Sequence, residues 1–221
     1  IRRPPRSTQG VSSAASDVYK RQEYTYALIA DFLVGQRTGD LVATVSTSRM
    51  LNDIADKHSV KLHRTPVGVG HVIEKMGEIG AALGGEGTGG VIFPEILHTA
   101  DGITSIAAIL QLLVSSHGSI TDLVSLMPRY WMNKRKIGVP SQDVADAILE
   151  MALTVFANED LDITDGVKRE RDDKWVNIRK SGTEPAIRVF SEARSIQEAE
   201  ELCQSTVEAL EFFKKRVTSC D

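Results

Sequence analysis

The sequence predicts an α/β fold: a layered α/β domain, followed by a smaller α+β domain with an antiparallel sheet and helices on one face. Three observations support this. From residue 41 to about residue 127, short β-branched runs alternate with segments of helical period. After Pro128 the alternation stops, and three strand-like runs follow one another without helices between them. One helical segment precedes those runs and another follows them, which is the order of an α+β domain.

The first domain is predicted to span residues 23–128. Its strands are expected at residues 41–46, 60–65 and 81–85, and its helices at 48–59, 70–80, 101–118 and 119–128. Strands that alternate with helices in this way are typical of a parallel sheet. Asp101 is expected to cap the third of these helices, and Ser119 with Asp122 the fourth.

The second domain is predicted to span residues 141–221, after a linker at residues 129–140. The linker segment is basic and aromatic and has neither the helical nor the strand period. The domain is expected to contain a helix at 141–158, strands at 161–170, 174–180 and 186–193, and a closing helix from Ser195. Ser195 and Glu198 form a capping-box pattern at the start of that helix.

Residues 1–22 differ in composition from the rest. They carry a net charge of +4, so the remaining 199 residues carry −8 of the chain's total of −4. The segment has no amphipathic period and no apolar core of a signal peptide. It resembles translated sequencing-adapter sequence, and we interpret it as a non-native or disordered leader, with the native protein entering near Glu23.

Charge and composition also exclude some classes of function. An acidic body argues against nucleic acid as a partner, because such binding depends on cations that meet phosphates. No apolar run approaches the ~18 residues of a membrane span, so no membrane is expected. The two cysteines, Cys203 and Cys220, are too few for a disulfide framework and show no metal-ligand spacing with the five histidines. A cytoplasmic location is therefore expected.

The first loop that suggests chemistry is GGEGTGGVIFPEI, residues 84–96. It satisfies the G-x-G-x-x-G pattern, but a β-branched run follows where a dinucleotide site needs a helix. A carboxylate and a hydroxyl among glycines suit sugar hydroxyls, because a carboxylate accepts hydrogen bonds from two neighbouring hydroxyls. Glu86, Gly87 and Thr88 are therefore candidate substrate-binding residues. The alternative is a long turn whose glycines only adopt positive φ.

The second loop is NIRKSGTEPAIRVFSEA, residues 177–193. Its arginines, hydroxyls and glycine suit an anion, because backbone N–H groups of a small-residue turn and two guanidinium groups all donate. The candidate phosphate-binding residues are Arg179, Ser181, Gly182, Thr183 and Arg188. The alternative is a hairpin turn whose two arginines pair with Glu170, Glu184 or Glu192 at the surface.

Together the two loops resemble those of one known family. RKSGTEPAIRVFSEA is similar to the phosphate-binding loop of the α-D-phosphohexomutases, the family of phosphomannomutase, phosphoglucomutase and phosphoglucosamine mutase. GGEGTGG resembles the family's sugar-recognition loop, and TPVGVGHVIEKM and DITDGVK resemble its flanking segments. The resemblance covers roughly residues 25–218 in the same order. It extends to two of the family's four domains, the third (sugar-binding) and the fourth (phosphate-binding).

The resemblance implies a phosphosugar mutase that moves phosphate between C1 and C6 of a phosphorylated hexose or hexosamine. In the family, a serine of the first domain donates the phosphoryl group and an Asp-rich loop of the second holds Mg²⁺. This chain has neither motif, so no catalytic residue and no metal ligand are expected in it, and the fragment alone is expected to be inactive. The alternative function is a non-catalytic phosphosugar-binding module.

Three departures from the family pattern leave the preferred sugar open. Gly90 stands where many members have histidine, TPVGVGHV lacks a lysine, and HTADG lacks an arginine before the aspartate. The oligomeric state is also open. His71 and His98 are expected to be surface or packing residues. Trp175 is expected either to border the phosphate site or to cover the sheet.

Overall fold

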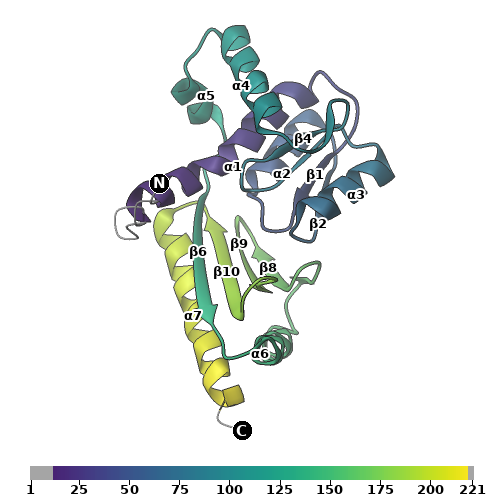
Figure 1. The fold of residues 1–221 in the computed structure, drawn as a ribbon. Helices are drawn as coiled ribbons and strands as arrows, with labels where there is room; N and C mark the ends of the chain where they lie inside the picture. The colour runs from purple at the N-terminus through teal and green to yellow at the C-terminus, as the bar shows by residue number, and fades with distance from the viewer. Residues whose placement is uncertain (1–11, 219–221) are drawn as a thin grey trace, which may run out of the picture.

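The computed structural model describes residues 12–218, with side chains from Glu23 onward. Two sheets of five strands each form the centres of two domains, and strand β6 leads from the first domain into the second (Figure 1). The first sheet is mixed and the second is antiparallel. The predicted succession of an α/β domain and an α+β domain is confirmed.

The first sheet has the strand order β2-β1-β3-β4-β5. Its strands are β1 (Leu41–Thr44), β2 (Leu62–Thr65), β3 (Leu83–Gly85), β4 (Val91–Phe93) and β5 (Leu97–Ala100). Strands β1, β2 and β3 are parallel, as expected, but β4 and β5 are antiparallel. The loop between β3 and β4 is too short for a crossover connection, so β4 must return beside β3 in the opposite direction.

Helices cover both faces of this sheet. They are α1 (Ser12–Val34), α2 (Met50–His58), α3 (Val69–Ile79), α4 (Gly102–Ser116) and α5 (Ile120–Leu126). Buried residues of α1, α2 and α4 form one core with Leu41, Leu83 and their neighbours on one face of the sheet. Helix α3 packs Val72 and Met76 against Val42 and Ile92 on the other. The predicted caps at Asp101 and Ser119 are present.

Helix α1 was not predicted, because its central residues lack a helical period. Residues 26–30 are all buried, since α1 lies in the middle of the domain, with apolar groups around its whole circumference. The Tyr26 hydroxyl donates to the carbonyls of Val42 and Leu83 at 3.0 and 3.3 Å, which fastens α1 beneath β1 and β3. The helix begins at Ser12 and therefore includes residues 12–22 of the segment that we interpret as a non-native or disordered leader. Residues 1–11 lie outside the described residues.

Helices α4 and α5 project from the first domain (Figure 1). The predicted apolar helix 101–118 is present as α4, yet Ile103, Ile106 and Val114 are exposed. No single helix of the described chain is long and apolar enough to cross a membrane. Among the described helices, α4 and α5 reach that length and composition when they are taken together, with an 88° bend between them.

The second sheet has the strand order β6-β10-β9-β8-β7, and α6 (Gln142–Val155) and α7 (Ile196–Thr218) cover one face. Its strands are β6 (Trp131–Gly138), β7 (Leu161–Asp162), β8 (Val167–Arg171), β9 (Lys174–Lys180) and β10 (Ala186–Ala193). Ile148, Ile178, Val189 and Leu210 meet in its core. Ser195 caps α7 as predicted, accepting from the Glu198 N–H at 3.2 Å.

The expected linker at 129–140 requires a correction, because residues 131–138 form the edge strand β6. All eight residues of β6 pair with β10. The strand contains Lys134, Arg135 and Lys136, and charged side chains are common on edge strands, where they prevent pairing with other molecules. The three successive charges conceal the alternation of period two that predicts a strand.

Candidate functional site

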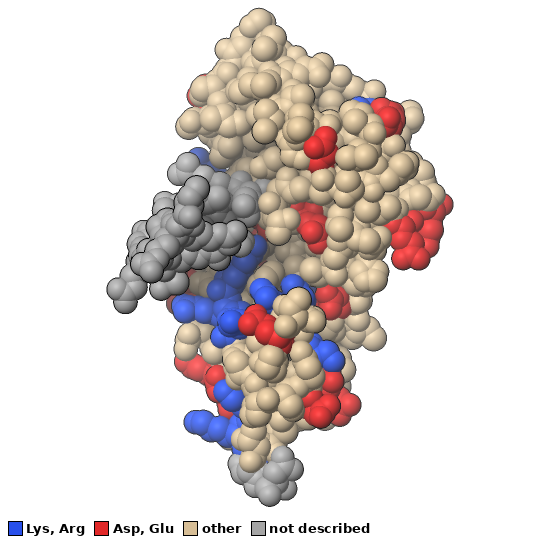
Figure 2. Space-filling view, viewed as in Figure 1, with Lys and Arg blue, Asp and Glu red and all other residues tan. Residues whose placement is uncertain are grey.

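A cavity of about 1100 Å³ lies between the two domains. Both predicted loops reach it: Glu86, Gly87 and Thr88 line it from the first domain, and Arg179 and Arg188 from the second. Lys and Arg side chains gather on the second domain beside the junction (Figure 2). Two loops that are about 90 residues apart in the sequence therefore face one space.

The first loop is a tight connection between β3 and β4. Glu86 N–H donates to the Gly90 carbonyl at 3.3 Å, and Gly89 N–H donates to the Glu86 carbonyl at 3.1 Å. Gly89 has a φ of 88°, which favours glycine. The Glu86 carboxylate accepts from the Gly68 N–H at 3.1 Å, and Thr88 is exposed. The loop is therefore a tight turn, and its polar side chains also line the cavity.

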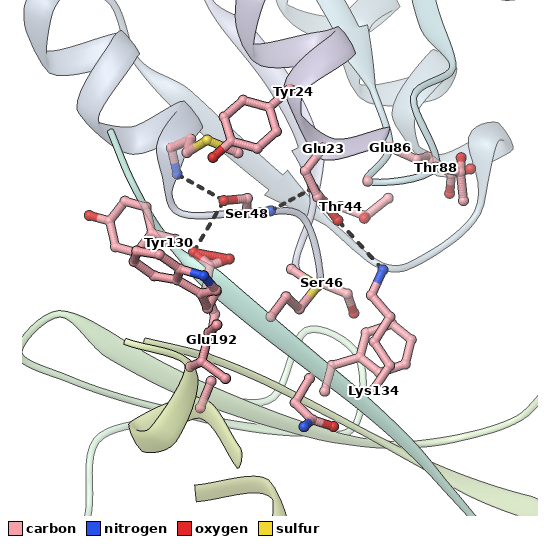
Figure 3. Close-up of a pocket in the computed structure, with 18 of the residues that line it drawn as sticks. Glu23, Tyr24, Thr44, Ser46, Ser48, Glu86, Thr88, Tyr130, Lys134 and Glu192 are labelled. Atoms are coloured by element: carbon pink, nitrogen blue, oxygen red, sulfur yellow. Dashed lines mark hydrogen bonds and ion pairs between the residues drawn. The ribbon is translucent and has the colours of Figure 1, made fainter. Parts of the chain in front are cut away.

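Gly87 is next to a buried carboxylate that the sequence did not single out. A Cβ at Gly87 would lie 2.1 Å from Glu23 Oε1, so a side chain at this position would force the Glu23 carboxylate to shift. Glu23 Oε2 accepts from the Ser48 N–H at 3.1 Å, and Lys134 Nζ of the second domain lies 3.6 Å from Oε1 (Figure 3). Burial raises the pKa of Glu23, while Lys134 and the Ser48 bond oppose the shift.

The two predicted arginines are in register. Arg188 of β10 is directly opposite Arg179 of β9, so both side chains project from the sheet face that borders the cavity. Burial is the main cause that lowers the pKa of Arg179, and the charge of Arg188 adds to it. Arg179 lies over the Phe190 ring at 5.7 Å, and its buried Nε has no hydrogen-bond partner among the described residues.

The second loop closes the hairpin between β9 and β10. Ser181 is buried; its N–H donates to the Ala186 carbonyl at 2.8 Å, and its Oγ accepts from Arg188 Nε at 3.4 Å. The predicted anion nest therefore lacks the Ser181 N–H, because that donor closes the hairpin. Gly182 and Thr183 are exposed at the end of the loop and are outside the cavity lining.

Helix α6 holds this second loop in place. The Gln142 side-chain amide donates to the carbonyls of Ser181 and Glu184 at 3.2 and 3.0 Å. Both carbonyls therefore point toward α6, which fixes the path of the loop. Gln142 is the first residue of α6, so helix packing in the core sets the position of the loop.

The surface ion-pair alternative applies to one arginine only. Arg188 Nη2 lies 3.2 Å from Glu184 Oε1, whereas Arg179 has no ion pair with a carboxylate among the described residues. Glu170 pairs with Lys168 at 3.2 Å and with Arg49. Glu192 is buried and accepts hydrogen bonds from the first domain. Neither Glu170 nor Glu192 therefore pairs with Arg179 or Arg188.

Glu192 connects the two domains beside the cavity. It accepts from Ser48 Oγ at 3.1 Å (Figure 3) and from Arg49 N–H at 3.0 Å. Burial, with the negative charge of Glu23 in addition, raises the pKa of Glu192 to about 7, although the Arg49 and Ser48 bonds act in the opposite direction. Asn177 adds a second connection, since it accepts from Ser46 Oγ at 2.9 Å.

Among the residues that line the cavity, the sequence analysis did not propose the charged residues Glu23, Lys134, Lys136 and Glu192 as site residues. The two lysines alternate along β6, and a strand interpretation of residues 131–138 would have placed them on one face. Trp175 is on the cavity side of the sheet but is buried, with Lys168 Nζ 4.9 Å from its ring, so it covers the sheet. His71 and His98 are exposed and do not line the cavity.

No group of three or more His, Cys, Asp or Glu side chains in residues 23–218 could hold a metal ion. The cavity thus offers cations, hydroxyl groups and carboxylates. These groups are suited to binding an anion and a polyhydroxy ring.

Sequence comparisons agree with this chemistry. The profile of the family described as phosphoglucomutase/phosphomannomutase, alpha/beta/alpha domain III, matches residues 21–130, and that of the phosphoglucomutase/phosphomannomutase C-terminal domain matches residues 132–209. A phosphoglucomutase/phosphomannomutase of Thermococcus kodakarensis is 37% identical over 188 residues, 85% of this chain and 41% of that protein. A phosphoglucosamine/phosphogalactosamine mutase of Sulfurisphaera tokodaii is 32% identical over 156 residues, 70% of this chain and 34% of that protein.

Solved structures share the fold at low identity. A phosphoglucomutase/phosphomannomutase family protein from Burkholderia thailandensis has a TM-score of 0.71 at 20% identity, covering 89% of this chain and 42% of that chain. A putative phosphomannomutase from Thermus thermophilus has a TM-score of 0.68 at 19% identity, with coverage of 87% and 41%. The chain spans about two fifths of the length of the first of these relatives. It belongs to the phosphoglucomutase/phosphomannomutase family of α-D-phosphohexomutases, and the part that it spans matches domain III and the C-terminal domain.

Proposed function

We propose that this chain supplies sugar and phosphate recognition to a longer phosphohexomutase, which moves phosphate between C1 and C6 of a hexose or hexosamine phosphate. The observation that carries this proposal is the shared cavity, with Glu86 and Thr88 on one side and the in-register pair Arg179 and Arg188 on the other. Phosphoryl transfer depends mainly on positioning and on stabilisation of charge, and these residues are suited to positioning.

The two sides of the cavity suit the two ends of a sugar phosphate. A phosphate monoester carries a charge between −1 and −2 at neutral pH, and guanidinium groups bind it with charge-assisted hydrogen bonds. Carboxylate oxygens of Glu86 accept from ring hydroxyls, and Thr88 accepts or donates one more bond. The bisphosphorylated intermediate must present either phosphate in turn, so the same arginines would hold the phosphate that is not reacting.

A related structure supports the class of ligand and the metal. The N-acetylphosphoglucosamine mutase of Aspergillus fumigatus, at 14% identity and a TM-score of 0.60, forms a crystalline complex with GlcNAc-6P and magnesium. For this chain Mg²⁺ would serve the parent protein, where it would stabilise charge on the transferring phosphoryl group. Its ligands would lie in the Asp-rich loop outside this chain, since residues 23–218 offer no cluster that fits it.

Binding of glucose 6-phosphate or mannose 6-phosphate by the complete 221-residue chain tests the proposal. Arg188→Ala is expected to weaken binding by roughly 10- to 150-fold in titration calorimetry, because a charge-assisted bond contributes about 1.5–3 kcal/mol. Arg171→Ala is the matched control, since Arg171 is on β8 with its side chain 86% exposed and away from the cavity. Equal binding by the Arg188 variant and the parent would refute the phosphate role.

Glu86→Ala separates the sugar loop from the phosphate loop. This variant is expected to weaken binding of sugar phosphates more than binding of inorganic phosphate, because Glu86 faces the ring hydroxyls. Equal losses for both ligands would contradict the assignment of Glu86.

The alternative is a phosphosugar-binding module that senses a metabolite without catalysis. The two functions differ in the upstream reading frame: a phosphoserine motif and an Asp-rich loop there would favour the mutase. The isolated chain is expected to show no turnover with Mg²⁺ and a bisphosphate primer. Robust turnover would overturn the assignment of catalysis to the missing part.

A further inference from the structure

A third cation continues the arginine row across the second sheet. Lys136 of β6 is directly opposite Arg188 of β10, which is itself opposite Arg179 of β9. Residues directly opposite one another on neighbouring strands share a face, so the three side chains stand in one line on the cavity face. All three line the cavity, and no local sequence motif links Lys136 to the other two.

One carboxylate joins two members of this row. Glu184 Oε1 lies 3.2 Å from Arg188 Nη2, and Glu184 Oε2 lies 3.1 Å from Lys136 Nζ. Each carboxylate oxygen thus contacts a different cation, as two oxygens of a phosphate group would. The side chains of Glu184, Arg188 and Lys136 are between 36% and 56% exposed, so a dissolved anion can reach them.

The backbone of Glu184 stays in place when its side chain moves. The Gln142 amide holds the Glu184 carbonyl at 3.0 Å, and the Pro185 carbonyl accepts from the Val139 N–H at 3.0 Å. A change of side-chain rotamer is therefore enough to free both cations, without movement of the loop. A phosphate monoester has more charge and one more terminal oxygen than the carboxylate that it would replace.

We propose that Lys136 is a third phosphate-binding cation and that Glu184 is an internal counter-ion, which a phosphate monoester displaces from Lys136 and Arg188. This inference rests on the proposed function, since it extends the same phosphate site. It assigns two opposite effects to neighbouring charged residues: Lys136 strengthens phosphate binding and Glu184 competes with it. A purely structural ion pair on an edge strand would produce neither effect.

The test measures affinity of the complete chain for inorganic phosphate and for glucose 6-phosphate at constant ionic strength. Lys136→Met keeps an apolar stem of similar length and is expected to weaken both affinities by about 3- to 10-fold, since one partly exposed charge-assisted contact is lost. Glu184→Gln keeps the shape but removes the competing charge, and is expected to strengthen both affinities by about 3- to 10-fold.

Matched controls separate a specific site from general charge. Lys174→Met removes the same charge from β9 at a position outside the cavity lining, and Glu208→Gln removes one negative charge from the exposed face of α7. Neither is expected to change affinity measurably. An effect of Lys136→Met no larger than that of Lys174→Met would overturn the role of Lys136.

The outcome for Glu184 is equally decisive. Weaker phosphate binding by Glu184→Gln would mean that Glu184 supports the loop, and the counter-ion role would be wrong. Arg188→Ala keeps the two proposals distinct. If it leaves binding unchanged, the phosphate site itself fails; if it weakens binding while Lys136→Met does not, only the third cation fails.

Discussion

The two glycine-bearing loops face the same cavity, yet their glycines are explained differently. In residues 85–90, a Cβ at Gly85 would lie 2.7 Å from the Gly90 carbonyl oxygen, and a Cβ at Gly87 would lie 2.1 Å from Glu23. In the loop between β9 and β10, a Cβ at Gly182 would meet no atom within 4 Å. Packing against backbone therefore disfavours a side chain at Gly85, a side chain at Gly87 would displace the Glu23 carboxylate, and packing makes no demand at Gly182.

This difference teaches how to interpret glycine in a binding motif. Where a neighbouring group occupies the space, glycine is needed for packing whether or not a ligand binds. Where the space is open and φ lies outside the left-handed region, as at Gly182, packing gives no reason for glycine. There we infer that glycine leaves room for a ligand to approach the backbone.

The largest expected effect concerns the contact that keeps the two loops opposite each other. Glu192 has a pKa raised to about 7 from an ordinary 4.5, mainly by burial. The folded protein therefore holds the proton more tightly than the unfolded chain, and this contribution is present below about pH 4.5 and is lost as pH rises through about 7. The loss is on the order of 3 kcal/mol.

Glu192→Gln removes this titration. Urea unfolding between about pH 4.5 and 8 is expected to show the parent losing stability relative to the variant as pH rises. Parallel curves for the two proteins would contradict a buried, titrating Glu192. The role of Glu192 in holding the two loops opposite each other would then lose its support.

The second prediction concerns the crowded loop. Gly85→Ala is expected to destabilise the chain by about 1–3 kcal/mol, because the new methyl group would overlap the Gly90 carbonyl and the Tyr26 ring. Gly77→Ala is the matched control: it is inside α3 with open space around it, and alanine there should stabilise by about 0.5–1 kcal/mol. Chemical unfolding measures both. Equal stability of the Gly85 variant and the parent would show that this loop is not crowded.

The third prediction concerns the support of the phosphate loop. Gln142→Ala removes two hydrogen bonds to loop carbonyls and is expected to cost about 1–2 kcal/mol of stability, with weaker phosphate binding. Gln204→Ala on exposed α7 is the control and should change stability by less than about 0.5 kcal/mol. An unchanged phosphate affinity after Gln142→Ala would mean that the hairpin alone sets the path of the loop.

The smallest effect on stability is expected at the open glycine. Gly182→Ala should change the free energy of unfolding by less than about 0.5 kcal/mol, since its Cβ meets nothing. Phosphate affinity should nevertheless fall, because the methyl group would occupy the space through which a ligand approaches the backbone. Loss of stability without loss of affinity would reverse the distinction between the two loops.

Much of the fold was predictable because its signals are local. The periods of α2, α3, α6 and α7 and the β-branched run of β1 each lie within one continuous segment of at most 23 residues. Helix α1 escaped prediction because burial on all sides removes the period. Strand β6 was not predicted because its charged side chains hide the strand pattern. Charges are common on an edge strand, and the edge position of β6 follows from its pairing with β10.

For the site, the sequence by itself determined which side chains each loop presents: a carboxylate and a hydroxyl among glycines in one, two arginines around a small-residue turn in the other. The tertiary structure decided what these loops share. Domain packing brings them to one cavity and adds Glu23, Lys134 and Lys136 from elements with no local motif. The physical reason is that strand register and burial depend on contacts between residues far apart in the chain, whereas turn chemistry depends on neighbours along it.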